Sequence, residues 1–189
     1  MKHEINSQNT KSMLAETLLS LLKKKPISKI TVSEIVTLCS INRKTFYYHF
    51  SDVYDLLEWH LNEELQKILL TLNPLDDFNT TISVAIDYTK NNHYLRNCID
   101  NPIGRDKIVR FLNKNVYPTS SEMLNTLEQR YEKSLTPDLK DFLVKSMTHI
   151  TVLSILDAIE NPDGYDRERM LLYLSDIFEA SVDGFFQKL

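Results

Sequence analysis

The sequence has 189 residues, a formal net charge of −4 and three glycines. This length suits one large domain, or a small domain joined to a larger one. Phosphate-binding loops need clustered glycines, and the three here are isolated, which argues against a nucleotide-binding α/β enzyme. Residues 1–50 carry eight Lys and Arg against three Asp and Glu, whereas residues 51–189 carry fourteen against twenty-three. The basic N-terminal part therefore suits a phosphate-rich partner, and the acidic remainder does not.

Several other classes are disfavoured by motif and composition. Cys39 and Cys98 lie far apart without metal-ligand spacing, which favours ordinary thiols in a reducing, cytoplasmic setting. The polar N-terminus is unlike a signal peptide, and we find no apolar run near the length of about 18 residues that spans a membrane. The motifs HExxH, CxxC and GxSxG and the P-loop do not occur. We therefore expect no catalytic residues, no metal, no cofactor and no membrane partner.

The fold class predicted is all-α. The six prolines fall between amphipathic stretches, where helices begin or end: Pro26, Pro74, Pro102, Pro118, Pro137 and Pro162. Leucines recur at helical spacing from Thr10 to Lys24, which predicts a first helix with one apolar stripe.

A helix-turn-helix is predicted from Thr31 to Phe50. Thr31 and Glu34 form a capping box, in which the Thr31 hydroxyl accepts from the Glu34 amide and the Glu34 carboxylate reaches back. A break at residues 39–41 is followed by Asn42, which is a good cap for a second helix. That second helix is rich in cations, hydroxyls and aromatic rings, as expected of a recognition helix aimed at double-stranded DNA.

The residue types in this motif indicate different roles on DNA. Arg43 and Lys44, in the first turn of the second helix, are the candidates for reading bases in the major groove. Hydroxyl, phenol, amide and imidazole groups suit phosphate contacts, which set register rather than specificity. Phe46 and Phe50 are expected in the core. The predicted DNA-binding set is Thr31, Ser33, Asn42, Arg43, Lys44, Thr45, Tyr47, Tyr48 and His49.

The run from Lys29 to Leu57 resembles the N-terminal domain of the TetR family of bacterial transcription regulators. Residues 45–50 match that family's T-[FL]-Y-x-H-F signature in order. The resemblance implies a three-helix DNA-binding domain followed by a variable helical domain for effector binding and dimerisation. Two positions depart from the pattern: Ser40 stands where Gly is common, which implies a strained backbone or a different turn, and Val53 stands where a Lys is usual.

The predicted domain boundary lies at residue 50. The DNA-binding domain covers residues 1–50, with the first turn of a fourth helix included to about residue 55, and the effector and dimerisation domain covers residues 51–189. The fourth helix is predicted from about Asp52 to Leu72, with Ser51 and Asp52 as caps and Trp59 in packing. His60 and Glu64 have i, i+4 spacing but lack further ligands for a metal.

Four helical stretches are predicted in the middle of the chain. They begin at Phe78, His93, Arg105 and Thr119, the last two being separated or kinked near Pro118. A turn at residues 73–77 precedes them. Because the resembled family binds small effectors between such helices, polar residues embedded here and in the next helix are effector candidates. They are Tyr88, His93, Tyr94, Arg96 and His149.

Two long helices are predicted at the end of the chain, Asp138–Glu160 and Arg167–Phe186, and both are apolar over more than one face. In the resembled family such a pair packs against its copy as a four-helix dimer interface. The predicted interface residues are Met147, Ile150, Leu153, Leu174, Ile177, Phe178 and Phe185.

These observations predict a transcriptional repressor that binds a near-palindromic operator as a homodimer under control of an unknown small-molecule effector. An alternative remains open, an activator or adaptor controlled by a protein partner. It rests on a faint likeness of NRKTFYYHFSDVYDLLEW to regulators of dihydroxyacetone-kinase operons.

Overall fold

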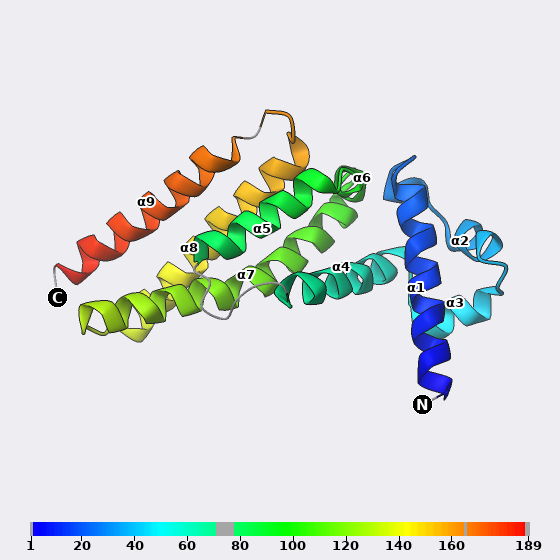
Figure 1. The fold of residues 1–189 in the computed structure, drawn as a ribbon, viewed down its shortest axis with the longest axis horizontal. Coiled ribbons are helices and arrows are strands. Elements are labelled where there is room, and N and C mark those ends of the chain that lie inside the picture. The colour runs from blue at the N-terminus through cyan, green and yellow to red at the C-terminus, as the bar shows by residue number, and fades with distance from the viewer. Residues whose placement is uncertain (1, 71–77, 165, 188–189) are drawn as a thin grey trace. The chain divides into compact units, whose positions relative to one another are not determined.

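The computed structural model describes residues 2–70, 78–164 and 166–187, and within them the chain is all-α, as predicted. Figure 1 shows these helices in chain order. A short 3-10 helix, Ile27–Lys29, follows the first helix. The α-helices are α1 Lys2–Leu22, α2 Val32–Leu38, α3 Arg43–His49, α4 Val53–Leu69, α5 Phe78–Asn91, α6 Tyr94–Cys98, α7 Pro102–Tyr131, α8 Pro137–Glu160 and α9 Arg167–Phe186.

The helices form two compact units. Unit 1 comprises Met1–Thr71 and His93–Ile108, and unit 2 comprises Leu72–Asn92 and Val109–Leu189. Unit 1 is larger than the DNA-binding domain predicted at residues 1–50, because α4 and α6 pack with it. The boundary at residue 50 between the DNA-binding and effector domains stays a prediction. The two units are defined by which residues contact one another, and this does not show which residues bind DNA or an effector.

Unit 1 is built on the leucine stripe of α1. Leu14, Leu18 and Leu22 recur every fourth residue, so they lie on one face of the helix, and all three are fully buried. Phe46 of α3 and Leu56 of α4 are also fully buried. The first helix begins at Lys2, which corrects the predicted start at Thr10.

The start of α4 is capped as predicted. Asp52 Oδ1 accepts from the Asp55 amide at 2.8 Å, and Asp55 Oδ2 accepts from the Ser51 amide at 2.8 Å. The helix ends at Leu69. Leu72, the predicted end, and the predicted turn at residues 73–77 lie outside the described residues.

The segment from α6 into α7 is joined to the rest of unit 1 by polar contacts. Asn97 Nδ2 donates to the Leu22 carbonyl at 2.7 Å, at the end of α1. Ser28 Oγ donates to Asp100 Oδ2 at 2.5 Å, next to the 3-10 helix. A Cβ on Gly104 would lie 2.0 Å from the Cys98 carbonyl oxygen, so the start of α7 packs too closely there for any side chain.

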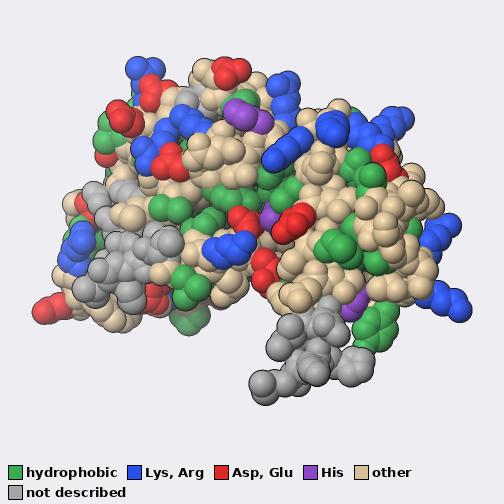
Figure 2. All heavy atoms as spheres, turned by 45° about the vertical axis from the view of Figure 1, so that its right-hand side comes forward, with side chains coloured by type: hydrophobic (Ala, Val, Ile, Leu, Met, Phe, Trp, Pro, Cys, Tyr) green, Lys and Arg blue, Asp and Glu red, His purple; other side chains and the backbone are tan. Residues whose placement is uncertain are grey.

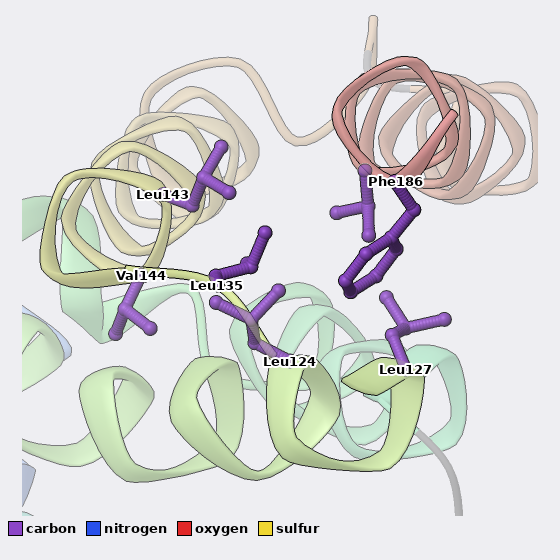
Figure 3. Packing of buried hydrophobic residues seen from close by; sticks show 7 residues of the cluster. Leu124, Leu127, Leu135, Leu143, Val144 and Phe186 are labelled. Carbon is purple, nitrogen blue, oxygen red and sulfur yellow. The ribbon is translucent and has the colours of Figure 1, made fainter. Parts of the chain in front are cut away.

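Unit 2 is a helical body made by α5, α8, α9 and α7 from Val109 onward. Figure 3 shows part of its core, where side chains from three helices and one loop point toward one another. That cluster consists of Leu124, Leu127, Leu135, Leu143, Val144, Val182 and Phe186. An ion pair between Arg167 Nε and Asp87 Oδ1, at 2.9 Å, joins α9 to α5.

Residues 102–131 form one helix, α7, that continues through Pro118. The predicted alternative of two separate helices is therefore wrong. Proline removes one backbone donor from a helix, but Pro118 is exposed, where water can satisfy the carbonyl that loses its partner.

The helix α8 begins within one residue of its predicted start despite its β-branched segment. It is also long and apolar enough to cross a membrane by length and composition, which corrects the expectation that no such stretch exists. Of its most apolar window, 61% is buried inside the structure, as in the core helix of a folded domain.

A buried contact between His60 and Tyr94 predicts how the stability of unit 1 depends on pH. His60 Nε2 lies 3.2 Å from the Tyr94 hydroxyl, joining α4 to α6. The pKa of His60 is lowered, mainly because the imidazole is buried. The charges of Glu64 and Glu63 raise this pKa and the charge of Lys67 lowers it, but burial has the largest effect. The unfolded chain therefore takes up a proton on His60 more readily than the folded chain.

We expect the free energy of unfolding to fall as pH decreases below the ordinary histidine pKa, with a smaller fall in His60→Gln. Urea denaturation of both proteins at pH 7.5 and pH 5.5 measures this. An equal loss in the two proteins would mean that other groups carry the pH dependence.

Candidate nucleic-acid interface

The first helix of the helix-turn-helix is capped by Thr31. Its hydroxyl accepts from the Glu34 amide at 3.2 Å, as predicted. The second half of the predicted capping box is wrong, because the Glu34 carboxylate receives Lys25 Nζ at 2.6 and 2.8 Å instead. This ion pair joins the segment that follows α1 to the first turn of α2. Both side chains are about one-third exposed, so its contribution is small.

The turn between α2 and α3 carries backbone strain at Ser40, whose φ is 54°. This value lies in the left-handed region, which costs a residue with a Cβ roughly 1 kcal/mol or more. The implication of a strained backbone at Ser40 is thus confirmed. The Ile41 amide then donates to the Val36 carbonyl at 3.0 Å, which closes the turn over the end of α2.

The recognition helix α3 begins at a side-chain cap. Asn42 Oδ1 accepts from the Thr45 amide at 2.8 Å and from the Thr45 hydroxyl at 3.1 Å. The hydroxyl of Thr45 is therefore already engaged inside the protein. At its other end α3 stops at Phe50, which is extended and 3% exposed. The helix between the N-cap Asn42 and the C-cap Phe50 has seven residues, Arg43–His49.

Burial divides α3 into two sides. Phe46 is fully buried and its ring meets Tyr47 edge-on, with 5.6 Å between centroids. Arg43 and Lys44 are exposed, and Tyr47 and Tyr48 are 51% and 82% exposed. Thr31 and Ser33, at the start of α2, are exposed as well. The predicted core residues Phe46 and Phe50 are confirmed. The exposed members of the predicted DNA-binding set are Thr31, Ser33, Asn42, Arg43, Lys44, Tyr47 and Tyr48.

His49 is half-buried, as is Thr45. Tyr48 packs edge-on against its imidazole, at 4.9 Å between centroids. Burial lowers the pKa of His49, and the nearby charge of Lys11 lowers it further. The imidazole is therefore mainly neutral at pH 7 and can donate one hydrogen bond.

Basic side chains predominate at the edge of unit 1 in Figure 2, in the right-hand part of the view. This agrees with the excess of Lys and Arg in residues 1–50. A surface of this kind attracts a polyanion through many weak interactions that salt screens.

The predicted effector residues are divided between the two units. His93, Tyr94 and Arg96 belong to unit 1, and Tyr88 and His149 belong to unit 2. Of these, His93, Arg96 and His149 are exposed, and Tyr94 is buried against His60. Neither unit by itself gathers the predicted set around a pocket.

A hollow that the sequence did not suggest lies on unit 2. It measures about 430 Å³ and its lining is polar: Glu122, Asn125, Glu128, Gln129, Glu132, Lys133 and Ser134. Burial raises the pKa of Glu128, but hydrogen bonds from Lys140 and from the Leu135 amide outweigh it and hold the pKa below its ordinary value. The Glu128 carboxylate is thus used to join α7 to α8. The part of the chain that the structure describes contains no group of three or more His, Cys, Asp or Glu fit to hold a metal.

The predicted dimer-interface residues separate into two groups. Met147, Leu174 and Phe178 are at most 3% exposed and pack inside unit 2, so they cannot form a surface for a second copy. Phe185 packs beside the core cluster. Ile150, Leu153 and Ile177 are 37%, 57% and 49% exposed. Three other large apolar residues of α8 and α9 are also exposed, Phe142, Leu172 and Tyr173.

Comparison with solved structures gives matches over nearly the whole chain. A dihydroxyacetone kinase operon activator, DhaS, is 16% identical with a TM-score of 0.67, covering 92% of this chain and 96% of that one. A TetR transcriptional regulator from Streptococcus agalactiae is 23% identical with a TM-score of 0.63, covering 94% and 98%. The fatty acid degradation regulator FadR from Bacillus halodurans is 14% identical with a TM-score of 0.61, covering 89% and 93%.

The chain has the fold of TetR-type transcriptional regulators. The resemblance stated from residues 29–57 is therefore confirmed as a likeness of fold. No family model matches the sequence, and no curated protein matches it. At these identities the likeness shows the fold alone, and a shared fold does not by itself determine function.

The cap of α3 can be tested through stability. Asn42→Ala removes both hydrogen bonds to Thr45 and should lower the free energy of unfolding by about 1 kcal/mol. Asn42→Asp keeps an acceptor oxygen and should stay close to the wild type. Ser33→Ala, an exposed change on α2, is the control and should alter stability by less than about 0.5 kcal/mol. Urea denaturation measures all three, and a neutral Asn42→Ala would show that the cap does not hold α3.

Proposed function

We propose that this protein is a sequence-specific, DNA-binding transcriptional regulator rather than an enzyme. The observation that carries the proposal is the two-sided α3, which buries Phe46 and exposes Arg43, Lys44, Tyr47 and Tyr48. A capped helix with this distribution can enter the major groove of DNA while its buried side anchors it to the protein. The regulators with the same fold support the proposal.

The proposed roles follow from side-chain chemistry. Arg43 and Lys44 stand in the first turn of α3, where both side chains can donate hydrogen bonds to guanine, Arg with the more fixed geometry. Tyr47, Tyr48 and His49 donate to phosphate oxygens. Thr31 and Ser33 reach phosphate from the start of α2, whereas Asn42 and Thr45 act mainly by holding α3 in place.

We propose that the regulator acts as a homodimer on a near-palindromic operator. The supporting observation is the large apolar side chains exposed on the last two helices, Phe142, Ile150, Leu153, Leu172, Tyr173 and Ile177. Exposed apolar residues gathered on neighbouring helices mark an interaction surface. In a two-fold dimer this pair of helices packs against the same pair in the second copy. The dimer then carries two recognition helices, which read two half-sites about one helical turn of DNA apart.

We propose control by a small-molecule effector that binds in the cytoplasm and relieves repression. Ser120 of α7 and Thr151 of α8 are fully buried in unit 2, and their hydroxyls have no partner among the described residues. Buried hydroxyls without partners are costly, and a bound polar molecule would satisfy them. Such a ligand shifts the equilibrium between two body conformations by its difference in affinity for them.

The second candidate is an activator or adaptor controlled by a protein partner. One specific observation favours it: the structure with a TM-score of 0.67 is described as an operon activator. Co-purification of a protein partner, with no change in DNA affinity on adding small molecules, would favour this alternative.

The DNA-binding roles predict different effects for two substitutions. Arg43→Ala should cost roughly 1–3 kcal/mol of binding free energy and relax specificity at one base pair. Tyr47→Phe should weaken binding to all sequences alike. Fluorescence polarisation on DNA flanking the protein's own gene and on a scrambled duplex, at physiological salt, measures both.

Two results would contradict this scheme. Equal affinity of the wild type for the flanking and scrambled duplexes would rule out sequence-specific regulation. Identical behaviour of the two variants would refute the division of roles between Arg43 and Tyr47.

The dimer surface predicts that Leu153→Glu is monomeric. A carboxylate at the centre of an apolar interface is desolvated without a partner, which disfavours association. Leu38→Glu, at a position of similar exposure on α2, is the matched control and should stay dimeric. Sedimentation equilibrium measures the mass against the 22.1 kDa chain. A dimeric Leu153→Glu, or a wild type that is monomeric at micromolar concentration, would overturn the proposed interface.

A further inference from the structure

Lys11, in α1, is held by aromatic rings. Lys11 Nζ lies 5.9 Å from the centroid of the Phe50 ring and 5.8 Å from the centroid of the Trp59 ring. The two rings are 5.9 Å apart and tilted, so they form one aromatic platform under the ammonium group. Distances below about 6 Å are those of a cation–π contact.

This platform stands directly beside the end of α3. Phe50 is the residue that ends the recognition helix, and Trp59 comes from the second turn of α4. The lowered pKa of His49, which is caused first by burial and then by Lys11, agrees with an ammonium group close to the last turn of α3.

The cation at this position is free to bind an anion. None of the ion pairs between side chains that the structure describes involves Lys11, whereas Lys25 is paired with Glu34. A ring face attracts the charge of the ammonium group without accepting all of its three N–H groups. The ammonium group therefore keeps donors for an oxygen ligand, while the platform limits the positions that a long lysine side chain explores.

We propose that Lys11 is a phosphate-binding residue of the DNA interface, positioned by Phe50 and Trp59 next to His49. The inference rests on the proposed DNA-binding function and extends the interface from α2 and α3 to α1. In this arrangement Lys11 and His49 contact the same stretch of DNA backbone, one as a cation and the other as a neutral donor. Trp59 is a positioning residue that acts through Lys11.

The test compares the salt dependence of DNA binding. Each phosphate neutralised by a cation contributes about 0.9 to the slope of log K against log salt. Lys11→Gln should reduce that slope by about 0.9 on both flanking and scrambled duplexes, and Lys11→Arg should retain it. Lys24→Gln is the matched control, because Lys24 is exposed and lies beyond the end of α1, which is about 16 Å from Lys11 by helical rise, and it should leave the slope unchanged.

A second comparison tests the positioning role of Trp59. Trp59→Leu should weaken DNA binding several-fold in the wild type but not in Lys11→Gln, since its effect passes through Lys11. Additive losses would overturn the positioning role. Trp59 is the chain's single tryptophan, so its emission in the DNA-free protein reports on the platform directly. That emission should change in Lys11→Gln and not in Lys24→Gln.

The outcomes separate this inference from the proposed function. If the wild type binds duplex DNA and Lys11→Gln keeps the wild-type slope, Lys11 is not a phosphate ligand and only the further inference fails. If the wild type binds no duplex DNA in low salt, the proposed function and this inference fail together. A slope that falls equally in Lys11→Gln and Lys24→Gln reports the loss of net charge alone, and this result also overturns the assignment.

Discussion

The proposed recognition helix, α3, depends on the burial of Phe46. A helix of seven residues is too short to be stable by itself in water, because the entropic cost of nucleation exceeds what a few hydrogen bonds return. Phe46 is fully buried in unit 1, and burying a phenyl side chain contributes about 2–3 kcal/mol. The caps at Asn42 and Phe50 add to this. The burial of Phe46 therefore fixes α3 in place, and this fixes the directions in which Arg43 and Tyr47 face solvent.

The strained turn before α3 follows from the same constraint. Ser40 takes a left-handed conformation although it carries a Cβ. The chain tolerates this because Ile35 on one side and Phe46 on the other are both fully buried, which sets where α2 ends and where α3 begins. A glycine would adopt this conformation at a lower free-energy cost than Ser40. The positive φ is therefore set by the positions of α2 and α3 in unit 1 and not by a preference of the serine itself.

Local signals in the sequence were sufficient to predict the helix-turn-helix and the last helix. The caps at Thr31, Asn42 and Asp52 act over three residues, so sequence order alone brings donor and acceptor together. Longer-range partners could not be inferred in this way. The Glu34 carboxylate accepts from Lys25 and not from the backbone amide at the start of its own helix. His60 contacts Tyr94, which is 34 residues away in the sequence. The interface prediction failed at Leu174 and Phe178 for a related reason, since an apolar residue on a two-sided helix can face either its own core or a partner.

The helix α8 exposes large apolar side chains that the other helices of unit 2 do not bury. Its buried residues include Leu143 and Val152, which are nine residues apart and therefore lie on opposite sides of the helix. A helix that is apolar on most sides must be covered on most sides. The helices α5 and α9 pack against α8, yet Phe142 and Leu153 remain more than half exposed. The proposed second copy would remove this remaining surface from water, so the composition that builds the core of unit 2 would also drive its association.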